Sequence, residues 1–187
     1  MRRKDLIFYT ITVVLVALLA WQVVLNSSFK QQLNGLSNQD SQIHLIGGIG
    51  PLGSTHIHAD VKVYINGNAL DFSQKKYQLA TSFIHFEEGV GDVVHVHATG
   101  MTVGHLFKSL RGGLSSNCVV IDGVSYCNEN DKKLKFYVNG NQNNEFDNYE
   151  FHDLDKLLVS YGKEDSAQLQ KQLESITNLA PRYRAQK

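Results

Sequence analysis

The sequence predicts an α+β domain with a mostly antiparallel sheet, preceded by one transmembrane helix. Three observations lead to this fold class: an uncharged apolar run near the N-terminus, a series of short alternating segments separated by turn signals, and two helical segments. One helical segment lies among the strands and the other follows them, which is typical of α+β domains. The most specific expectation is a β-grasp-like arrangement, and 187 residues leave room for about one such domain.

Residues 1–25 predict a cytoplasmic basic start and a transmembrane signal-anchor. Residues 6–25 carry no charge, and twenty helical residues at about 1.5 Å each span the roughly 30 Å hydrocarbon core of a bilayer. A cleaved signal peptide has a shorter apolar region and small residues at its cleavage site, but Leu18 stands where cleavage after Ala20 would need one. The basic residues of "MRRK" stay in the cytoplasm by the positive-inside rule. The rest of the chain is therefore expected outside, on a single-pass anchor in the cell membrane.

Residues 26–55 predict a flexible stalk between the anchor and the domain. The first part, "NSSFKQQLNGLSNQDSQ", is polar, and "GGIGPLGST" is rich in glycine and contains a proline. Such compositions are typical of flexible or irregular backbone. The extracytoplasmic α+β domain is expected to begin after the stalk and to cover residues 56–162.

Three segments of this domain predict strands that carry histidine. "HIHADVKVYI" (56–65) alternates strictly between apolar and polar residues, and "SFIHFEE" (82–88) and "DVVHVHA" (92–98) alternate over shorter lengths. Residues two apart in a strand share a face, so the apolar residues form a core face and the histidines lie on the opposite face. Further strands are expected in "LKFYV" (134–138) and "DKLLVSYG" (155–162).

The segment "MTVGHLFKSLRGG" predicts the short internal helix. Thr102 is a good N-cap, and Gly112 is placed for the C-terminal cap. The apolar residues fall at i, i+3, i+4 and i+7, which is the spacing of one helical face. These residues are Val103, Leu106, Phe107 and Leu110.

A C-terminal amphipathic helix and tail are expected over residues 163–187. Asp165 and Gln168 have the spacing of a capping box, and Pro181 is placed to end the helix. The apolar residues Leu169, Leu173, Ile176 and Ala180 recur at helical spacing. Such a face could dock a protein partner or pair two copies of the chain in a homo-oligomer.

The two cysteines predict a disulfide across a β-hairpin. In "CVVIDGVSYC", Asp122-Gly123 is a strong signal for a two-residue turn. Counting outward from this turn places Cys118 opposite Cys127, in a non-hydrogen-bonded pair with Cα atoms about 4.5 Å apart. A bridge is feasible there, near the short limit of disulfide geometry, and an oxidising exterior lets it persist. It acts either as a structural staple or, if strained, as a labile pair in thiol–disulfide exchange.

The histidines of the first three strands predict a transition-metal site. If the strands are neighbours, four or five imidazoles converge, and neutral imidazole is a preferred ligand of zinc and copper. Asp60 and Glu87 are candidate ligands, or outer partners that fix the histidine tautomers. Met101 and His105 lie beside the short helix, and a thioether would favour copper. The candidate ligands are His56, His58, His95 and His97, with His85, His105 and Met101 as second choices.

Two other functions remain open on the sequence alone. The first is a non-enzymatic interaction domain whose polar, pH-responsive histidine face binds a partner. The second is thiol–disulfide exchange through Cys118 and Cys127, although the chain has no Cys-x-x-Cys motif. Lysine plus arginine equals aspartate plus glutamate at 18 each, so the basic footprint of a nucleic-acid-binding protein is missing. No phosphate-binding loop or nucleophile elbow occurs in the sequence. The sequence therefore does not assign an enzymatic activity to the chain. If the chain has one, it is expected to be disulfide-isomerase-like or metal-dependent.

The segments "HIHADVKVYINGN", "VVHVHATGMTVGHLF" and "DLDKLLVSYG" resemble those of a family of small membrane-anchored archaeal proteins. The resemblance covers roughly residues 55–180, and paired His-x-His motifs recur in the family. Some members carry the automatic label protein-disulfide isomerase. That label implies thiol–disulfide exchange by a Cys-x-x-Cys motif on a thioredoxin-like fold. This chain departs from the motif, because its two cysteines are expected to oppose each other across a hairpin.

Overall fold

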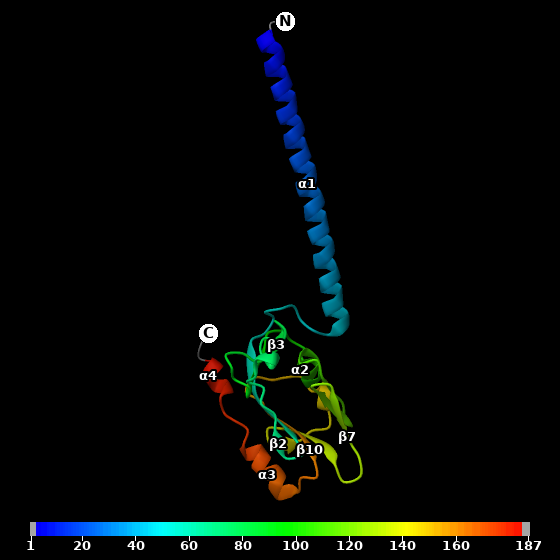
Figure 1. The fold of residues 1–187 in the computed structure, drawn as a ribbon, viewed down its shortest axis with the longest axis vertical. Helices are drawn as coiled ribbons and strands as arrows, with labels where there is room; N and C mark the ends of the chain where they lie inside the picture. Colours follow the sequence, from blue (N-terminus) through cyan, green and yellow to red (C-terminus); the bar gives the residue numbers. More distant parts are fainter. Residues whose placement is uncertain (1–2, 185–187) are drawn as a thin grey trace. The chain divides into compact units, whose positions relative to one another are not determined.

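The computed structural model describes residues 3–184, with side chains for residues 11–35 and 47–183. The chain divides into two units, residues 1–47 and residues 48–187. The first unit is a single helix, α1 (Arg3–Gly47), drawn in blue in Figure 1. Its segment Ile11–Gly35 is long and apolar enough to cross a membrane.

The helix α1 continues through much of the expected stalk, so the prediction of irregular backbone from residue 26 is wrong as far as Gly47. The stalk sequence up to this point contains no proline, and its leucine, glutamine and lysine residues are good helix formers. The helix ends where two glycines occur together, and Gly48 adopts a positive φ of 68°. Such a glycine is a common C-terminal stop.

The second unit contains a seven-stranded sheet in the order β3-β4-β1-β10-β8-β9, with β2 paired to β1. The central pair, β1 and β10, is parallel, and the other pairs are antiparallel. The strands are β1 (Ile57–Ile65), β2 (Asn68–Ala69), β3 (Ile84–His85), β4 (Val93–Val96), β8 (Lys133–Val138), β9 (Asn141–Gln142) and β10 (Lys156–Gly162). The predicted α+β class with a mostly antiparallel sheet is confirmed. Because α2 lies between β4 and β8 in the chain, the inner order β4-β1-β10-β8 is that of a β-grasp.

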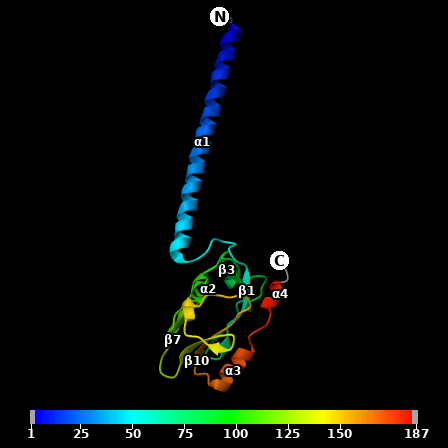
Figure 2. The ribbon, with the colours of Figure 1, turned by 180° about the vertical axis from the view of Figure 1, so that it is seen from behind.

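The two faces of this sheet are covered by different parts of the chain. The helix α2 (Val103–Ser109) and a small sheet of β5 (Gly113–Leu114), β6 (Cys118–Ile121) and β7 (Val124–Cys127) lie on one side. The helices α3 (Ser166–Glu174) and α4 (Ala180–Arg184) lie on the other side in both ribbon views (Figures 1 and 2). Two short 3-10 helices, η1 (Lys75–Tyr77) and η2 (Phe146–Asn148), complete the unit.

The hydrophobic core lies between the sheet and α2. It includes the alternating apolar residues of β1 and β4 and the predicted apolar face of α2. Its most buried members include Ala59, Val61, Val63, Val94, Val96, Val103, Leu106 and Phe107. The predicted alternation is therefore confirmed, and it leaves the histidines on the sheet face opposite the core.

The predicted caps of α2 are partly confirmed. Thr102 is the N-cap, and it forms a capping box in which the third residue of the helix is His105. The expected C-terminal role of Gly112 is not observed, because the positive-φ position after the helix is occupied by Arg111, at 58°. Gly112 instead packs so closely against β6 that an added Cβ would lie 2.2 Å from the Val120 carbonyl oxygen.

The C-terminal segment differs from the predicted single helix. The capping box of Asp165 and Gln168 is confirmed, but α3 ends at Glu174. A second helix, α4, begins at Ala180, so Pro181 lies in its first turn rather than ending a helix. Proline is tolerated there, because the first N–H groups of a helix have no intrahelical partner.

The hairpin has the predicted register. Cys118 pairs with Cys127 and Ile121 with Val124. The two cysteines form a disulfide, with Cα atoms 4.0 Å apart. The hairpin is anchored to the main sheet by Tyr161, whose hydroxyl donates to the Cys127 carbonyl oxygen at 2.8 Å. The disulfide therefore closes a hairpin that already has tertiary contacts.

Replacing both cysteines by serine is expected to lower the free energy of unfolding by about 2–3 kcal/mol, because the bridge restricts the unfolded chain over a loop of about ten residues. Urea unfolding of a fragment beginning at Gly48 measures this effect. A free energy of unfolding equal to that of the wild type would contradict a stabilising role for the bridge.

Candidate metal centre

Five histidines, on and directly beside β1, β3 and β4, form two rows across the sheet. His95 pairs in register with His58 on one side and with His85 on the other. At the ends of the paired strands β1 and β4, His56 and His97 also lie together, with ring centroids 4.6 Å apart. The histidine face, as we name these five residues, therefore arises from strand register and period-two alternation alone, as predicted.

Three of the five imidazoles are close enough to share one ion. The ligand atoms of His56, His58 and His95 all lie within 4.8 Å of one another. Two nitrogens bound to one tetrahedral zinc ion at 2.0–2.1 Å are about 3.3 Å apart. Side-chain rotations that shorten the longest separation by about 1.5 Å would therefore complete a three-histidine site.

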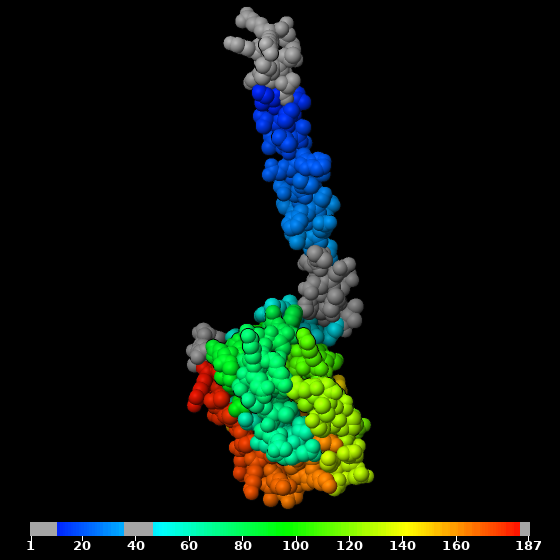
Figure 3. Space-filling model, in the orientation of Figure 1, coloured from blue at the N-terminus to red at the C-terminus, as the bar shows by residue number. Residues whose placement is uncertain are grey.

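The histidine face is more buried than the sequence indicates. His58 and His95 are only 1% and 3% exposed, whereas His56 is exposed. The C-terminal segment covers this face, and Tyr183 of α4 packs its ring on His95 at 4.8 Å and on His58 at 5.6 Å. Figure 3 shows the segment, coloured orange to red, on the surface of the folded unit. The predicted amphipathic helix indicated that the segment would pack, but not where, so Tyr183 was missed.

Glu87 takes the predicted outer position. Its Oε1 lies 3.2 Å from His95 Nδ1, and its Oε2 lies 3.3 Å from His85 Nε2. When the Nδ1–H group of the neutral ring donates a hydrogen bond to the carboxylate, His95 Nε2 keeps its lone pair. A carboxylate that orients a histidine in this way is a recurrent outer partner of metal ligands.

Asp60 has a different role from the predicted one. Its carboxylate is 1% exposed and accepts from the backbone N–H groups of Leu179 at 2.9 Å and Ala180 at 3.1 Å. The Thr177 hydroxyl also donates to it. Asp60 therefore holds the start of α4 against the sheet. Asp60 therefore affects the candidate metal centre indirectly, by holding the segment whose Tyr183 covers His58 and His95.

The two remaining candidates are engaged elsewhere. His105 Nδ1 accepts from the Thr102 backbone N–H at 3.0 Å, as part of the helix cap. Met101 is 5% exposed and belongs to the hydrophobic core. Neither shares a ring contact with the histidine face in the described structure. With Met101 in the core, the predicted bias towards copper loses its basis.

Burial keeps two of the five imidazoles neutral. It lowers the pKa of His95 to about 4, an effect that Glu87 opposes and that the neighbouring His58, His85 and His97 reinforce. Burial also lowers the pKa of His97, reinforced by His56 and His85. Because metal binding requires neutral imidazole, both rings are in their ligating form at neutral pH.

The chain was compared with protein-family models, with curated proteins and with solved structures, and none of them matches it.

Proposed function

We propose that the protein binds a transition-metal ion, zinc or copper, through His56, His58 and His95. The observation that carries the proposal is the grouping of three imidazole ligand atoms within 4.8 Å. Imidazole nitrogens suit both ions. Three protein ligands leave one coordination position open for water or for a ligand of another molecule.

The surroundings of the three imidazoles support this function. Glu87 orients His95, and Tyr183 shields the buried side of the pair formed by His58 and His95. The exposed member, His56, lies where an ion can arrive from solvent. Three grouped ligands with one accessible member favour reversible binding, as expected of a carrier or sensor, over a buried structural ion.

The proposed location is the outer face of a membrane. The helix segment Ile11–Gly35 is long enough to serve as the anchor, and the basic "MRRK" start favours a cytoplasmic N-terminus. A disulfide in the second unit fits an oxidising exterior. The metal site would then face the extracytoplasmic space.

The test is metal binding by the full-length chain in detergent micelles, prepared without a polyhistidine tag. Equilibrium dialysis against buffered Zn²⁺ or Cu²⁺ at pH 7.5, followed by mass spectrometry of the metal, gives stoichiometry and affinity. Replacing His58 by asparagine is expected to weaken binding at least 100-fold, since one of three ligands is removed and the outer partners alone are worth about 10–100-fold.

The matched control is His152→Asn, because His152 is an exposed histidine outside the histidine face. This variant should bind metal like the wild type. Equal binding by the His58 and His152 variants, or no binding by the wild type, would refute the proposed function.

A further inference from the structure

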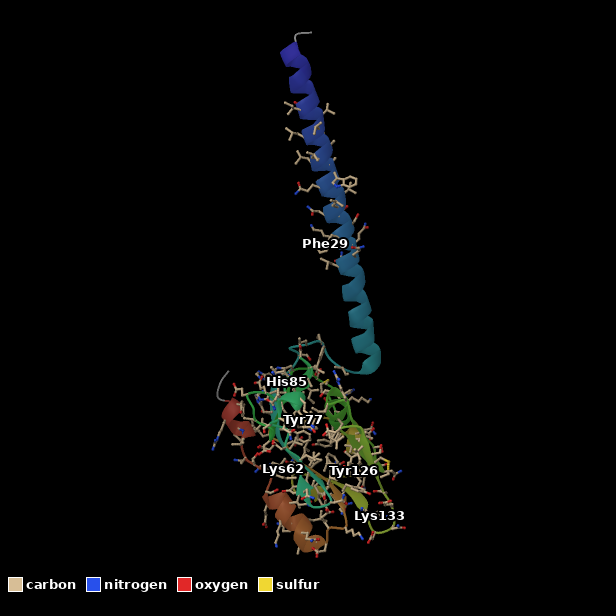
Figure 4. All side chains as sticks on the ribbon, viewed as in Figure 1. Phe29, Lys62, Tyr77, His85, Tyr126 and Lys133 are labelled. Atoms are coloured by element: carbon tan, nitrogen blue, oxygen red, sulfur yellow. A yellow bond between two sulfur atoms is a disulfide. The ribbon has the colours of Figure 1, made fainter. Side chains whose placement is uncertain are left out.

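Three polar groups of the same face lie around a separate cavity. His85, Glu87 and His97 line a space of about 510 Å³, together with Leu52, Gly53, Leu79, Thr81 and Ser82. His85 is on the edge strand β3 (Figure 4). Of these lining residues, none belongs to the group of three ligands proposed above. The cavity therefore presents two imidazoles and one carboxylate that the first centre does not use as ligands.

One contact in this cavity needs a proton or a metal ion between its two atoms. His85 Nδ1 lies 2.7 Å from the Thr81 carbonyl oxygen, and since a carbonyl only accepts, Nδ1 carries the proton. In the neutral ring Nε2 is then an acceptor, yet it faces Glu87 Oε2 at 3.3 Å. Two acceptors at this distance repel each other unless a proton or a metal ion lies between them.

The distance suits a metal ion. Ligand atoms that bind one tetrahedral zinc ion at 2.0–2.1 Å are about 3.3 Å apart, which matches the separation of His85 Nε2 and Glu87 Oε2. The ring of His97 stacks on His85 with centroids 5.1 Å apart, so a turn of the His97 side chain is needed for it to supply a third nitrogen. Mixed imidazole and carboxylate sets are common zinc ligands.

We infer that His85, Glu87 and His97 form a second, outer binding position for a divalent zinc-like ion. The outer position connects to the first centre in two ways. Glu87 contacts His95 through its other oxygen, and the His97 ring lies 4.6 Å from that of His56. An ion can therefore pass from one position to the other by exchanging one imidazole ligand at a time. This route rests on the proposed function, because it ends at the inner site.

The route explains how an ion reaches His58 and His95 although Tyr183 covers them. Half-buried His97 and the partly exposed Glu87 face the cavity, whereas the inner pair is almost fully buried. The outer position thus serves uptake and release, and the inner one holds the ion. Loss of the outer ligands should slow metal uptake as well as remove one equivalent.

The experiment counts Zn²⁺ bound by the full-length chain in micelles at pH 7.5 and follows the rate of uptake by stopped flow. The wild type and the control His152→Asn are expected to bind two equivalents. The outer variant His85→Gln/His97→Gln and the inner variant His56→Asn/His58→Asn should each bind one. Uptake by the outer variant should be at least ten times slower.

Other results separate the two proposals. One equivalent in the wild type, lost only in the inner variant, would overturn the outer position and keep the proposed function. One equivalent lost only in the outer variant would overturn the inner site instead, and no binding would overturn both. If the double variant unfolds by circular dichroism, the single variant His85→Gln replaces it, and the number of bound Zn²⁺ equivalents then shows whether the outer position has been lost.

Discussion

Replacing Asp60 by asparagine is expected to lower the free energy of unfolding by about 3 kcal/mol and to detach the C-terminal segment from the histidine face. The buried carboxylate accepts from Leu179 and Ala180, and hydrogen bonds to a charged group contribute about 1.5–3 kcal/mol each. The amide of asparagine would direct an N–H group at one of these donors. The variant therefore loses an acceptor and gains a repulsive contact.

Two measurements check this expectation. Urea unfolding gives the change in stability, and amide hydrogen exchange at Leu179 and Ala180 reports release of the segment. The matched control is Asp92→Asn, because Asp92 pairs with Lys62 at 2.6 Å but its side chain is 29% exposed. Partly exposed ion pairs of this kind contribute at most about 1 kcal/mol. Equal losses in the two variants, without faster exchange, would show that Asp60 does not hold the segment.

The metal-free protein is expected to lose about 2 kcal/mol of stability between pH 7.5 and pH 5 because of His95 alone. The folded pKa of His95 is about 4, below the ordinary value of 6.5. The unfolded chain therefore takes up a proton in this window while the folded chain does not, and proton uptake favours unfolding. The contribution is constant above about pH 6.5, falls as the pH drops towards 4, and then levels off.

The comparison is between the wild type and His95→Gln, unfolded with urea at both pH values in the presence of a chelator. Glutamine does not titrate, so the variant should lose less stability on acidification, by about 2 kcal/mol. His97 acts in the same direction, because burial also lowers its pKa, but it is retained in both proteins. Identical pH dependence in the two proteins would show that His95 is not buried as described.

Most of the fold follows from patterns that are local in the sequence. Alternation in residues 56–65 separates His58 from Ala59 by face, and the turn at Asp122-Gly123 sets the hairpin register. The convergence of histidines needed only one assumption, that the three strands are neighbours. These features could be predicted because strand period and turn geometry depend on near neighbours in the chain.

The parts that could not be predicted depend on contacts between distant residues. Asp60 and Ala180 are far apart in sequence, and no local pattern indicates that the carboxylate holds a helix start. The same contact explains why the predicted C-terminal helix is divided in two. Likewise, the burial of His95 beneath Tyr183 follows from the path of the C-terminal segment across the sheet, which helical spacing does not determine.

The position of this cover in the chain has a consequence for biosynthesis. The five histidines lie between residues 56 and 97 in the chain, whereas α4 begins at Ala180. A ribosome therefore delivers the histidine-bearing strands well before the residues that cover them. The antiparallel pairs that join β1, β4 and β3 involve no residue after Val96. During synthesis the imidazoles therefore pass through a period in which Tyr183 does not yet shield them from solvent.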